Sequence, residues 1–279
     1  MMNKRLKLTF ILIFISSLAI MSIPVKSQST ANIIISPDGS ITGTTAIVQD
    51  GDVYTLTANI TNDVFVQRSN IIVDGAGFAI IGKEMDKPLI DLTYGVGNPS
   101  TPQIYNVTIR NLMVVNGSIQ TNGGGNNTFY NNYIDVISLR GSTYNNITHC
   151  IIRNIEMSYG ASFNTITENN IMNGVSAFLV SNVTVDKNYW RFYLTEYPNA
   201  TEVGNTGIGN QPYVYWIVET STPLIYQDNH PLMKPVSIPL MSSSTASDVP
   251  EFPYLSVVAV LVIIAVSASA VLIARRRKT

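Results

Sequence analysis

The sequence is poor in the residues that carry charge, redox chemistry and metal binding. Charged residues make up 13% of the 279 positions, and the net charge is −1. No basic stripe lies outside the two ends, which argues against a nucleic-acid partner. Cys150 is the only cysteine, so no disulfide can form within the chain. We expect no cofactor.

Long apolar runs are confined to the two ends. Three basic residues, Lys4, Arg5 and Lys7, precede an uncharged apolar run over 8–23. This layout predicts a secretory signal peptide over 1–27, with an uncleaved N-terminal anchor as the alternative. Residues 254–274 carry no charge and are long enough to span the ~30 Å of bilayer hydrocarbon as a helix. The basic tail 275–279 follows and should stay on the cytoplasmic side, which leaves the body outside.

A short pattern recurs between about residue 70 and residue 190. An apolar residue is followed three positions later by Asn and five positions later by another apolar residue, as in Phe129, Asn132 and Ile134. The first positions are Phe129, Ile147, Ile166 and Val185, with steps of 18, 19 and 19 residues. A second apolar column is Ile119, Ile137, Ile155 and Val175, with steps of 18, 18 and 20 residues.

A period of about 19 residues is too short for most helical repeats. Short β-branched runs separated by Asn and Gly are typical of strands and turns. The pattern therefore predicts an all-β solenoid of about eight coils, in which successive coils pair as parallel strands. Ile72 or Val73 lies about two periods before Ile109, which predicts one extra coil between them.

The Asn column consists of Asn132, Asn169 and Asn188, and we expect it at a turn. Asn tolerates the left-handed conformation, and stacked side-chain amides can bond to one another along the rod. Cys150 interrupts this column. We therefore expect the substitution Cys150→Asn to leave the melting temperature unchanged or to raise it.

Three stretches after the last coil resemble the NosD-like group of parallel β-helix proteins: Asn-Tyr-Trp at 188–190, Gly-Ile-Gly-Asn-Gln-Pro-Tyr at 207–213 and Asp-Asn-His-Pro-Leu-Met at 228–233. The resemblance covers about 32–240 and implies a single-stranded right-handed parallel β-helix. Arg191 and Phe192 stand where this group often has Ser and Asp, and Asn210 stands where it often has Asp. If those acids bind a cation in relatives, this sequence does not keep that site.

The expected domain plan follows from these features. Residues 28–60 form an N-terminal cap with the first strands, 61–190 the β-helix, 191–240 a C-terminal cap segment and 241–253 a polar linker. The sequence Val-Pro-Glu-Phe-Pro at 249–253, followed by the apolar run and the basic tail, resembles archaeal sorting signals of the Pro-Glu-Phe type. That resemblance implies that a membrane transpeptidase removes the span and attaches the protein to a lipid. A plain stop-transfer anchor is the alternative.

One polar column offers acid–base chemistry. His149, Glu168 and Lys187 occupy the same position in successive coils, so neighbours should lie about 5 Å apart. A carboxylate beside a histidine can orient and activate it as a base. The structural alternative is a mixed polar ladder with one exposed ion pair, worth at most about 1 kcal/mol.

The NosD resemblance also implies a test for copper, which as Cu(I) prefers Cys, Met and His. His149 precedes Cys150, but adjacent strand residues point to opposite faces and should not share a metal. His230 and Met233 are the second pair, and the family segment suggests that they form a structural turn. We assign no metal site from the sequence.

Exposed tyrosines with neighbouring Asn side chains suit sugar faces and hydroxyls, whereas packing near turns is the alternative. The relevant aromatic residues are Tyr130, Tyr133, Tyr144, Tyr159, Trp190, Tyr193 and Tyr197. Seven Asn-x-Ser/Thr sequons are possible glycosylation sites: Asn59, Asn106, Asn116, Asn126, Asn146, Asn182 and Asn199.

The first functional hypothesis is a membrane-anchored extracellular β-helix protein, non-catalytic, which contacts glycans or other surface proteins. The second is a polysaccharide lyase or hydrolase that uses His149, Glu168 and Lys187. The third is a copper-handling protein like NosD.

Overall fold

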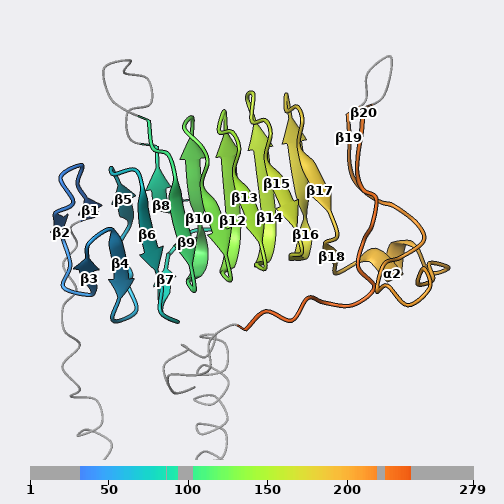
Figure 1. Ribbon diagram of the computed structural model, residues 1–279, viewed down its shortest axis with the longest axis horizontal. Helices are drawn as coiled ribbons and strands as arrows, with labels where there is room; N and C mark the ends of the chain where they lie inside the picture. Colours follow the sequence, from blue (N-terminus) through green and yellow to red (C-terminus); the bar gives the residue numbers. More distant parts are fainter. Residues whose placement is uncertain (1–31, 86, 94–102, 219–223, 240–279) are drawn as a thin grey trace, which may run out of the picture. The chain divides into compact units, whose positions relative to one another are not determined.

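The computed structural model describes residues 32–85, 87–93, 103–218 and 224–239. Four predicted segments lie outside the described residues: the signal peptide (1–27), the polar linker (241–253), the membrane span (254–274) and the basic tail (275–279). Within the described ranges, no helix is both long enough and apolar enough to cross a membrane. The chain divides into two units, Met1–Ile238 and Pro239–Thr279, and the first contains a β-solenoid of about seven turns (Figure 1).

One face of the solenoid is an eight-stranded sheet, which we call sheet B. All its pairings are parallel except the first, between β3 and β4. In spatial order its strands are β3 (Ile47–Asp50), β4 (Val53–Leu56), β6 (Ile71–Asp74), β9 (Val107–Arg110), β11 (Thr128–Tyr130), β13 (Asn146–Thr148), β15 (Thr165–Thr167) and β17 (Thr184–Asp186).

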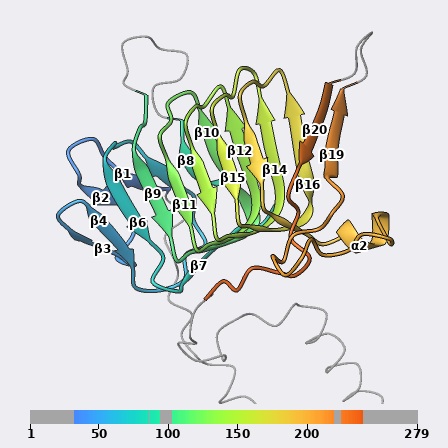
Figure 2. The same ribbon diagram turned by 45° about the vertical axis from the view of Figure 1, so that its right-hand side comes forward.

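The second sheet, sheet A, contains ten strands, and its longer strands bend (Figure 2). The first part of β10 pairs with β7 and its second part with β8. On its other side β10 pairs with β12, with a register shift between Val114 and Ser118. Its strands are β2 (Ile41–Thr42), β1 (Ile33–Ile35), β5 (Val64–Val66), β8 (Pro88–Leu92), β10 (Met113–Asn122), β12 (Tyr133–Arg140), β14 (Ile151–Ser158), β16 (Asn170–Phe178) and β18 (Tyr189–Trp190), with β7 (Ala79–Ile81) beside β10.

The apolar columns of the repeat line the inside of the coils. Phe129, Ile147, Ile166 and Val185 are direct partners in successive strands of sheet B, and each is at most 5% exposed. Ile119, Ile137, Ile155 and Val175 do the same in sheet A. Burying one such side chain contributes about 1.5–3 kcal/mol, and every coil contributes several. The predicted parallel repeat is therefore confirmed.

The extra coil predicted between Val73 and Ile109 is wrong. Val73 is the direct partner of Ile109, because β6 pairs with β9. The intervening sequence instead supplies β7 and β8 to sheet A. The number of residues between two repeat positions does not show whether they form a complete extra coil or an insertion within one coil.

Three corner positions recur with positive φ, where the chain turns sharply from one face to the next. Corner one consists of Asn111, Asn131, His149, Glu168 and Lys187, with φ between 52° and 57°. Corner two consists of Asn70, Asn106, Asn126, Tyr144, Phe163 and Asn182, with φ between 52° and 61°. Corner three consists of Gly123, Gly141, Tyr159 and Leu179, with φ between 53° and 70°.

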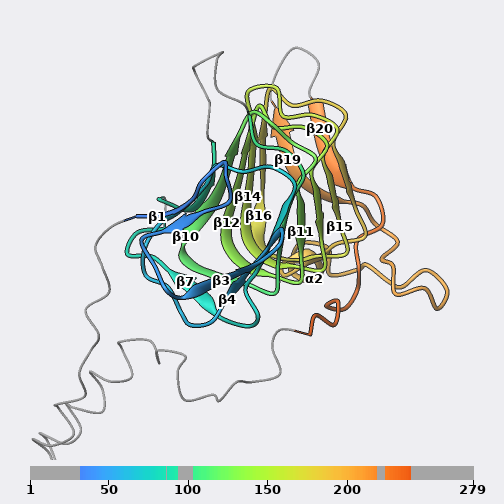
Figure 3. The same ribbon diagram turned by 60° about the vertical axis from the view of Figure 1, so that its left-hand side comes forward.

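The two ends of the solenoid are closed differently. At the N-terminal end, β2 pairs antiparallel with β1, and β3 pairs antiparallel with β4. Figure 3 shows the coils from this end. At the C-terminal end lie the short helix α2 (Tyr193–Glu196) and an antiparallel hairpin of β19 (Tyr213–Val218) and β20 (Leu224–Asp228). These covers interrupt the parallel ladder at both ends, and so limit edge-to-edge pairing with further chains.

Candidate functional site

The structure brings two of the three acid–base candidates together. His149 Nε2 lies 3.6 Å from Glu168 Oε2, and the side chains are 34% and 49% exposed. His149 also contacts Thr148 Oγ1 through Nδ1 at 2.9 Å, and its ring is tilted against Tyr130. No ion pair among the described residues joins Lys187 to Glu168. The arrangement is a partly exposed pair in which Thr148 contacts the second ring nitrogen of His149.

The positive φ of these three residues belongs to the corner and not to a special site. Asn111 and Asn131 have the same conformation at the same position in earlier coils. A non-glycine residue in this region costs roughly 1–2 kcal/mol. Because every coil bears this cost, the strain is a requirement of the solenoid and indicates no chemistry at His149 or Glu168.

The Asn column forms a buried hydrogen-bonded series that we call ladder one: Asn132, Cys150, Asn169 and Asn188. Asn188 Oδ1 accepts from the backbone N–H of Asn169, and Asn169 Oδ1 accepts from that of Cys150. The Nδ2 groups of Asn169 and Asn188 donate to carbonyls of Ile147 and Ile166. The expected left-handed conformation of these Asn residues is wrong, because it belongs to the preceding corner-one residue. The ladder side chain points inward, whereas the left-handed residue points outward.

Asp228 closes ladder one at the C-terminal end. Its Oδ2 accepts from the backbone N–H of Asn188 and from Trp190 Nε1, both at 2.9 Å. Its Oδ1 accepts from the backbone N–H groups of Lys187 and His230. Asp228 is fully buried, and burial raises the pKa of its carboxyl group. Asp228 belongs to the third stretch of the NosD resemblance, and Asn188 and Trp190 to the first, so these stretches pack together.

A second buried series, ladder two, was missed by the sequence reasoning: Asn127, Asn145 and Asn164. Asn145 Oδ1 accepts from the backbone N–H and the Nδ2 of Asn127, and Asn164 Oδ1 accepts from the same groups of Asn145. These residues are spaced 18 and 19 apart, each two positions before an inward apolar residue. The same period that located ladder one would have located this series.

The residues of the two copper candidates lie in different surroundings. Cys150 is fully buried in the core, and burial raises the pKa of its thiol to about 12. His149 is on the outer corner, and its nearest charged partner is Glu168. His230 Nδ1 lies 2.7 Å from Asp186 Oδ1 in an ion-pair geometry. Within the described ranges, no group of three His, Cys, Asp or Glu side chains could hold a metal ion.

The aromatic residues separate into core and surface. Trp190 and Tyr193 are buried, Tyr133 and Tyr197 are half-buried, and Tyr130 is 42% exposed near corner one. Five exposed side chains cluster around the loops that follow β12, β14 and β16, and we call them the aromatic rib. They are Tyr144 (60% exposed), Tyr159 (58%), Phe163 (46%), Phe178 (54%) and Leu179 (66%).

The rings of the rib pack against one another between successive coils. Tyr144 and Phe163 stack with centroids 4.9 Å apart and planes 5° apart. Tyr159 meets Phe178 edge-on, and the Arg140 guanidinium lies 4.2 Å from the Tyr159 centroid. Tyr144 and Phe163 are thus stacked along the direction in which coils are added, so they cover one another's faces.

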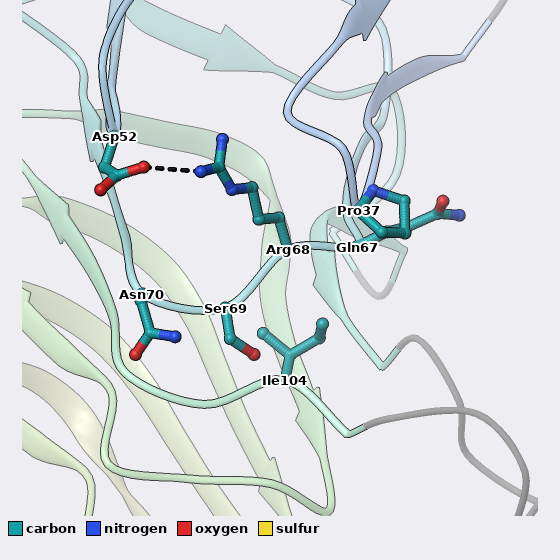
Figure 4. A pocket seen from close by; sticks show the side chains of 7 residues that line it. All are labelled: Pro37, Asp52, Gln67, Arg68, Ser69, Asn70 and Ile104. Atoms are coloured by element: carbon teal, nitrogen blue, oxygen red, sulfur yellow. Dashed lines mark hydrogen bonds and ion pairs between the residues drawn. The ribbon is translucent and has the colours of Figure 1, made fainter.

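A polar cleft of about 330 Å³ lies at the N-terminal end of the solenoid (Figure 4). It is lined by Pro37 after β1, Asp52 between β3 and β4, the run 67–70 between β5 and β6, and Ile104 before β9. Arg68 Nη2 forms an ion pair with Asp52 Oδ1 at 2.7 Å. No pattern in the sequence predicted this cleft, because its walls come from four separate segments.

Five of the seven sequon Asn residues are exposed: Asn106, Asn126, Asn146, Asn182 and Asn199. Asn59 and Asn116 are half-buried and bond to Ala79 N–H and the Gly82 carbonyl. Three of the exposed residues, Asn106, Asn126 and Asn182, belong to corner two. There an Asn at positive φ is followed by an inward residue and then by an outward Thr, so the corner itself generates the sequon pattern.

The chain matches no known protein in the three comparisons made. No protein-family model matches it. No curated protein matches it, and no solved structure does.

Proposed function

We propose that this protein is a membrane-anchored, extracellular, right-handed parallel β-helix protein of NosD-like type that binds a neighbouring surface protein and carries out no catalysis. The observation that supports this proposal is the aromatic rib. Large exposed apolar groups clustered in this way indicate an interaction surface. Tyr, Phe and Arg are also the residue types enriched in protein interfaces.

Val236 and the rib residue Phe178 lie at opposite ends of β16. Val236 exchanges two hydrogen bonds with the side chain of Asn170, at the start of β16. Phe178 of the rib ends the same nine-residue strand, which at ~3.3 Å per residue separates Phe178 from Asn170 by at most about 26 Å.

The geometry of the rib supports a protein partner over a sugar at this edge. Sugars stack on ring faces, but the near faces of Tyr144 and Phe163 cover each other. One face of Tyr159 carries the Arg140 guanidinium. Ring edges, the ring faces without these contacts, Leu179 and the Arg140 cation remain for a partner, and such a surface suits apolar side chains beside a carboxylate.

In situ photo-crosslinking tests this function. A photoreactive phenylalanine analogue replaces Phe163 in the full-length chain on intact cells, and the matched control carries it at Val48, which is also exposed (54%) but lies on β3. We expect a discrete protein adduct from position 163 only, lost when Leu179→Ser is added. Equal adducts from both positions, or none from position 163, would contradict the proposal. A peptide containing Leu261 in the mature protein would show that the span is retained.

A polysaccharide lyase or hydrolase is the second candidate, because His149 and Glu168 do approach to 3.6 Å. This hypothesis predicts that the protein degrades a polysaccharide and that the variant Glu168→Gln loses this activity. The matched control is Glu156→Gln, an exposed glutamate on β14.

A further inference from the structure

The cleft at the N-terminal end is close to electrically neutral. Arg68 and Asp52 form an ion pair at 2.7 Å in its lining, with side chains 27% and 63% exposed (Figure 4). Gln67, Ser69 and Asn70 add polar groups without charge. Because the guanidinium is already paired with a carboxylate, the cleft offers little attraction for an anion or a cation.

Arg68 is held in place by groups behind the cleft. Its Nη1 donates to the Tyr54 hydroxyl at 2.9 Å, and that hydroxyl donates to the Gly39 carbonyl at 3.0 Å. Tyr54 is fully buried. A Cβ on Gly39, which has φ 93°, would collide with the guanidinium. The donor is therefore preorganised, and this reduces the entropy cost of binding.

The lining retains hydrogen-bonding capacity of both kinds. Arg68 uses two of the five N–H groups of a guanidinium within the described chain. Ser69 Oγ accepts from the Tyr105 N–H, and Asn70 Oδ1 accepts from Asn106 Nδ2, which leaves the hydroxyl proton and the Asn70 amide protons. Asp52 Oδ2 supplies an acceptor. Donors and acceptors thus alternate around the cleft without a dominant charge.

We propose that this cleft binds a neutral polyhydroxyl ligand of the size of one sugar ring. Each hydroxyl of a sugar both donates and accepts, which matches the mixed lining. A volume of about 330 Å³ lies at the lower end of the range for ligand pockets, ~300–1,000 Å³. Tyr105, which follows the lining residue Ile104 and is 45% exposed, donates its backbone N–H to Ser69 Oγ. This site is independent of the rib and of the membrane tether.

Saturation-transfer NMR on the full-length chain in a zwitterionic, sugar-free detergent tests the proposal. The probes are the methyl glycosides of glucose, mannose and N-acetylglucosamine, with glucuronate as the anionic comparison. We expect saturable transfer to at least one neutral glycoside, with affinity reduced about tenfold in Gln67→Ala, whose side chain makes no hydrogen bond to another described residue. Gly39→Ala, which displaces Arg68, should reduce binding similarly while circular dichroism shows that the fold is retained.

Phe163→Ser, on the rib, should leave sugar binding unchanged. Absence of saturable transfer to any neutral glycoside at millimolar concentration would overturn the proposal. Binding that is unaffected by both cleft variants, or that is limited to glucuronate, would also overturn it. Gln67→Ala should not alter the photo-crosslink from position 163, so the failure of this proposal and of the proposed function remain distinguishable.

Discussion

The two asparagine ladders of the solenoid use the same hydrogen bonds but end differently. In both, a side-chain oxygen accepts a backbone N–H of the preceding coil, as Asn188 does for Asn169 and Asn164 for Asn145. Ladder two is followed by Val183, its equivalent in the next coil, which has no side-chain oxygen. Ladder one reaches the last coil, and there Asp228 of the cap supplies the acceptor that a further coil would have provided.

This difference shows how a repeat is terminated. A buried N–H without a partner costs roughly 1–3 kcal/mol, so a polar ladder at an open end needs a substitute for the missing coil. Asp228 comes from a hairpin that is not part of the repeat, and it also binds Trp190 Nε1. Ladder one therefore couples the stability of the coils to the docking of the cap, and ladder two does not.

The largest expected effect comes from breaking the end of ladder one. Asp228→Ala removes the acceptor for three backbone N–H groups and for Trp190 Nε1 in a fully buried position. We expect a loss of about 3–5 kcal/mol in the free energy of unfolding, measured by denaturant titration with tryptophan fluorescence. The control is Asp186→Ala, because Asp186 is a half-buried carboxylate near Asp228. Its free energy of unfolding should fall by about 1 kcal/mol or less. A loss below that of the control would contradict the role of Asp228.

The stability difference between the wild type and Asp228→Asn should depend on pH, which gives a second test of the buried Asp228 carboxyl group. Burial raises the pKa of the Asp228 carboxyl above 3.8 in the folded chain. A carboxyl group with a raised folded pKa favours folding below its unfolded pKa, and that contribution is lost as the pH rises through the folded pKa. The stability of the wild type relative to Asp228→Asn should therefore improve as the pH falls toward about 4. A relative stability that is flat or declines over this range would disagree.

Breaking the middle of ladder two should have the next largest effect. Asn145→Ala removes the acceptor for Asn127 and the donors to Ser142 Oγ and Asn164 Oδ1. We expect a loss of about 3 kcal/mol without any change in docking of the cap, since ladder two does not contact it. Asn146→Ala, the exposed neighbour, should change the free energy of unfolding by less than about 0.5 kcal/mol. Comparable losses in the two variants would refute the assigned register.

Repairing ladder one should have a smaller effect of opposite sign. Asn132 Nδ2 lies 3.8 Å from Cys150 Sγ, and the thiol in turn contacts the Phe129 carbonyl at 3.5 Å. An Asn side chain can supply the oxygen and the amide donor found in the other coils. Cys150→Asn should therefore raise the free energy of unfolding by about 1 kcal/mol, seen as a higher melting temperature, whereas Cys150→Ala should not. A drop of several degrees in Cys150→Asn would contradict the ladder.

The smallest effect is expected at corner one, outside both ladders. Glu168→Gln removes the charge of an exposed side chain whose ion-pair partner is His149. The free energy of unfolding should fall by no more than about 0.5 kcal/mol at neutral pH, measured in the same denaturant titration. A loss comparable to that of Asn145→Ala would show that corner one is part of the buried network.

Much of the fold could be predicted because the period is carried by local residue types. Apolar residues every 18 to 20 positions predicted the stacked columns of Phe129 and Ile137, and both proved buried. The spacing did not reveal that Val73 neighbours Ile109, because an insertion of variable length leaves no periodic signal. His149 and Glu168 were correctly expected to be close. The cleft around Arg68 escaped prediction, since its four segments share no pattern.

The sequence by itself determined the parallel solenoid and which residues face inward, because alternation along a strand and repetition between coils are both written in the order of residues. Only the tertiary structure decided which residue turns each corner, how ladder one is closed, and which polar groups meet around Arg68. The physical reason is that Asp228 and Asn188 are separated by 40 residues and joined by a buried hydrogen bond. A contact of that kind depends on where the cap docks, and no local preference specifies it.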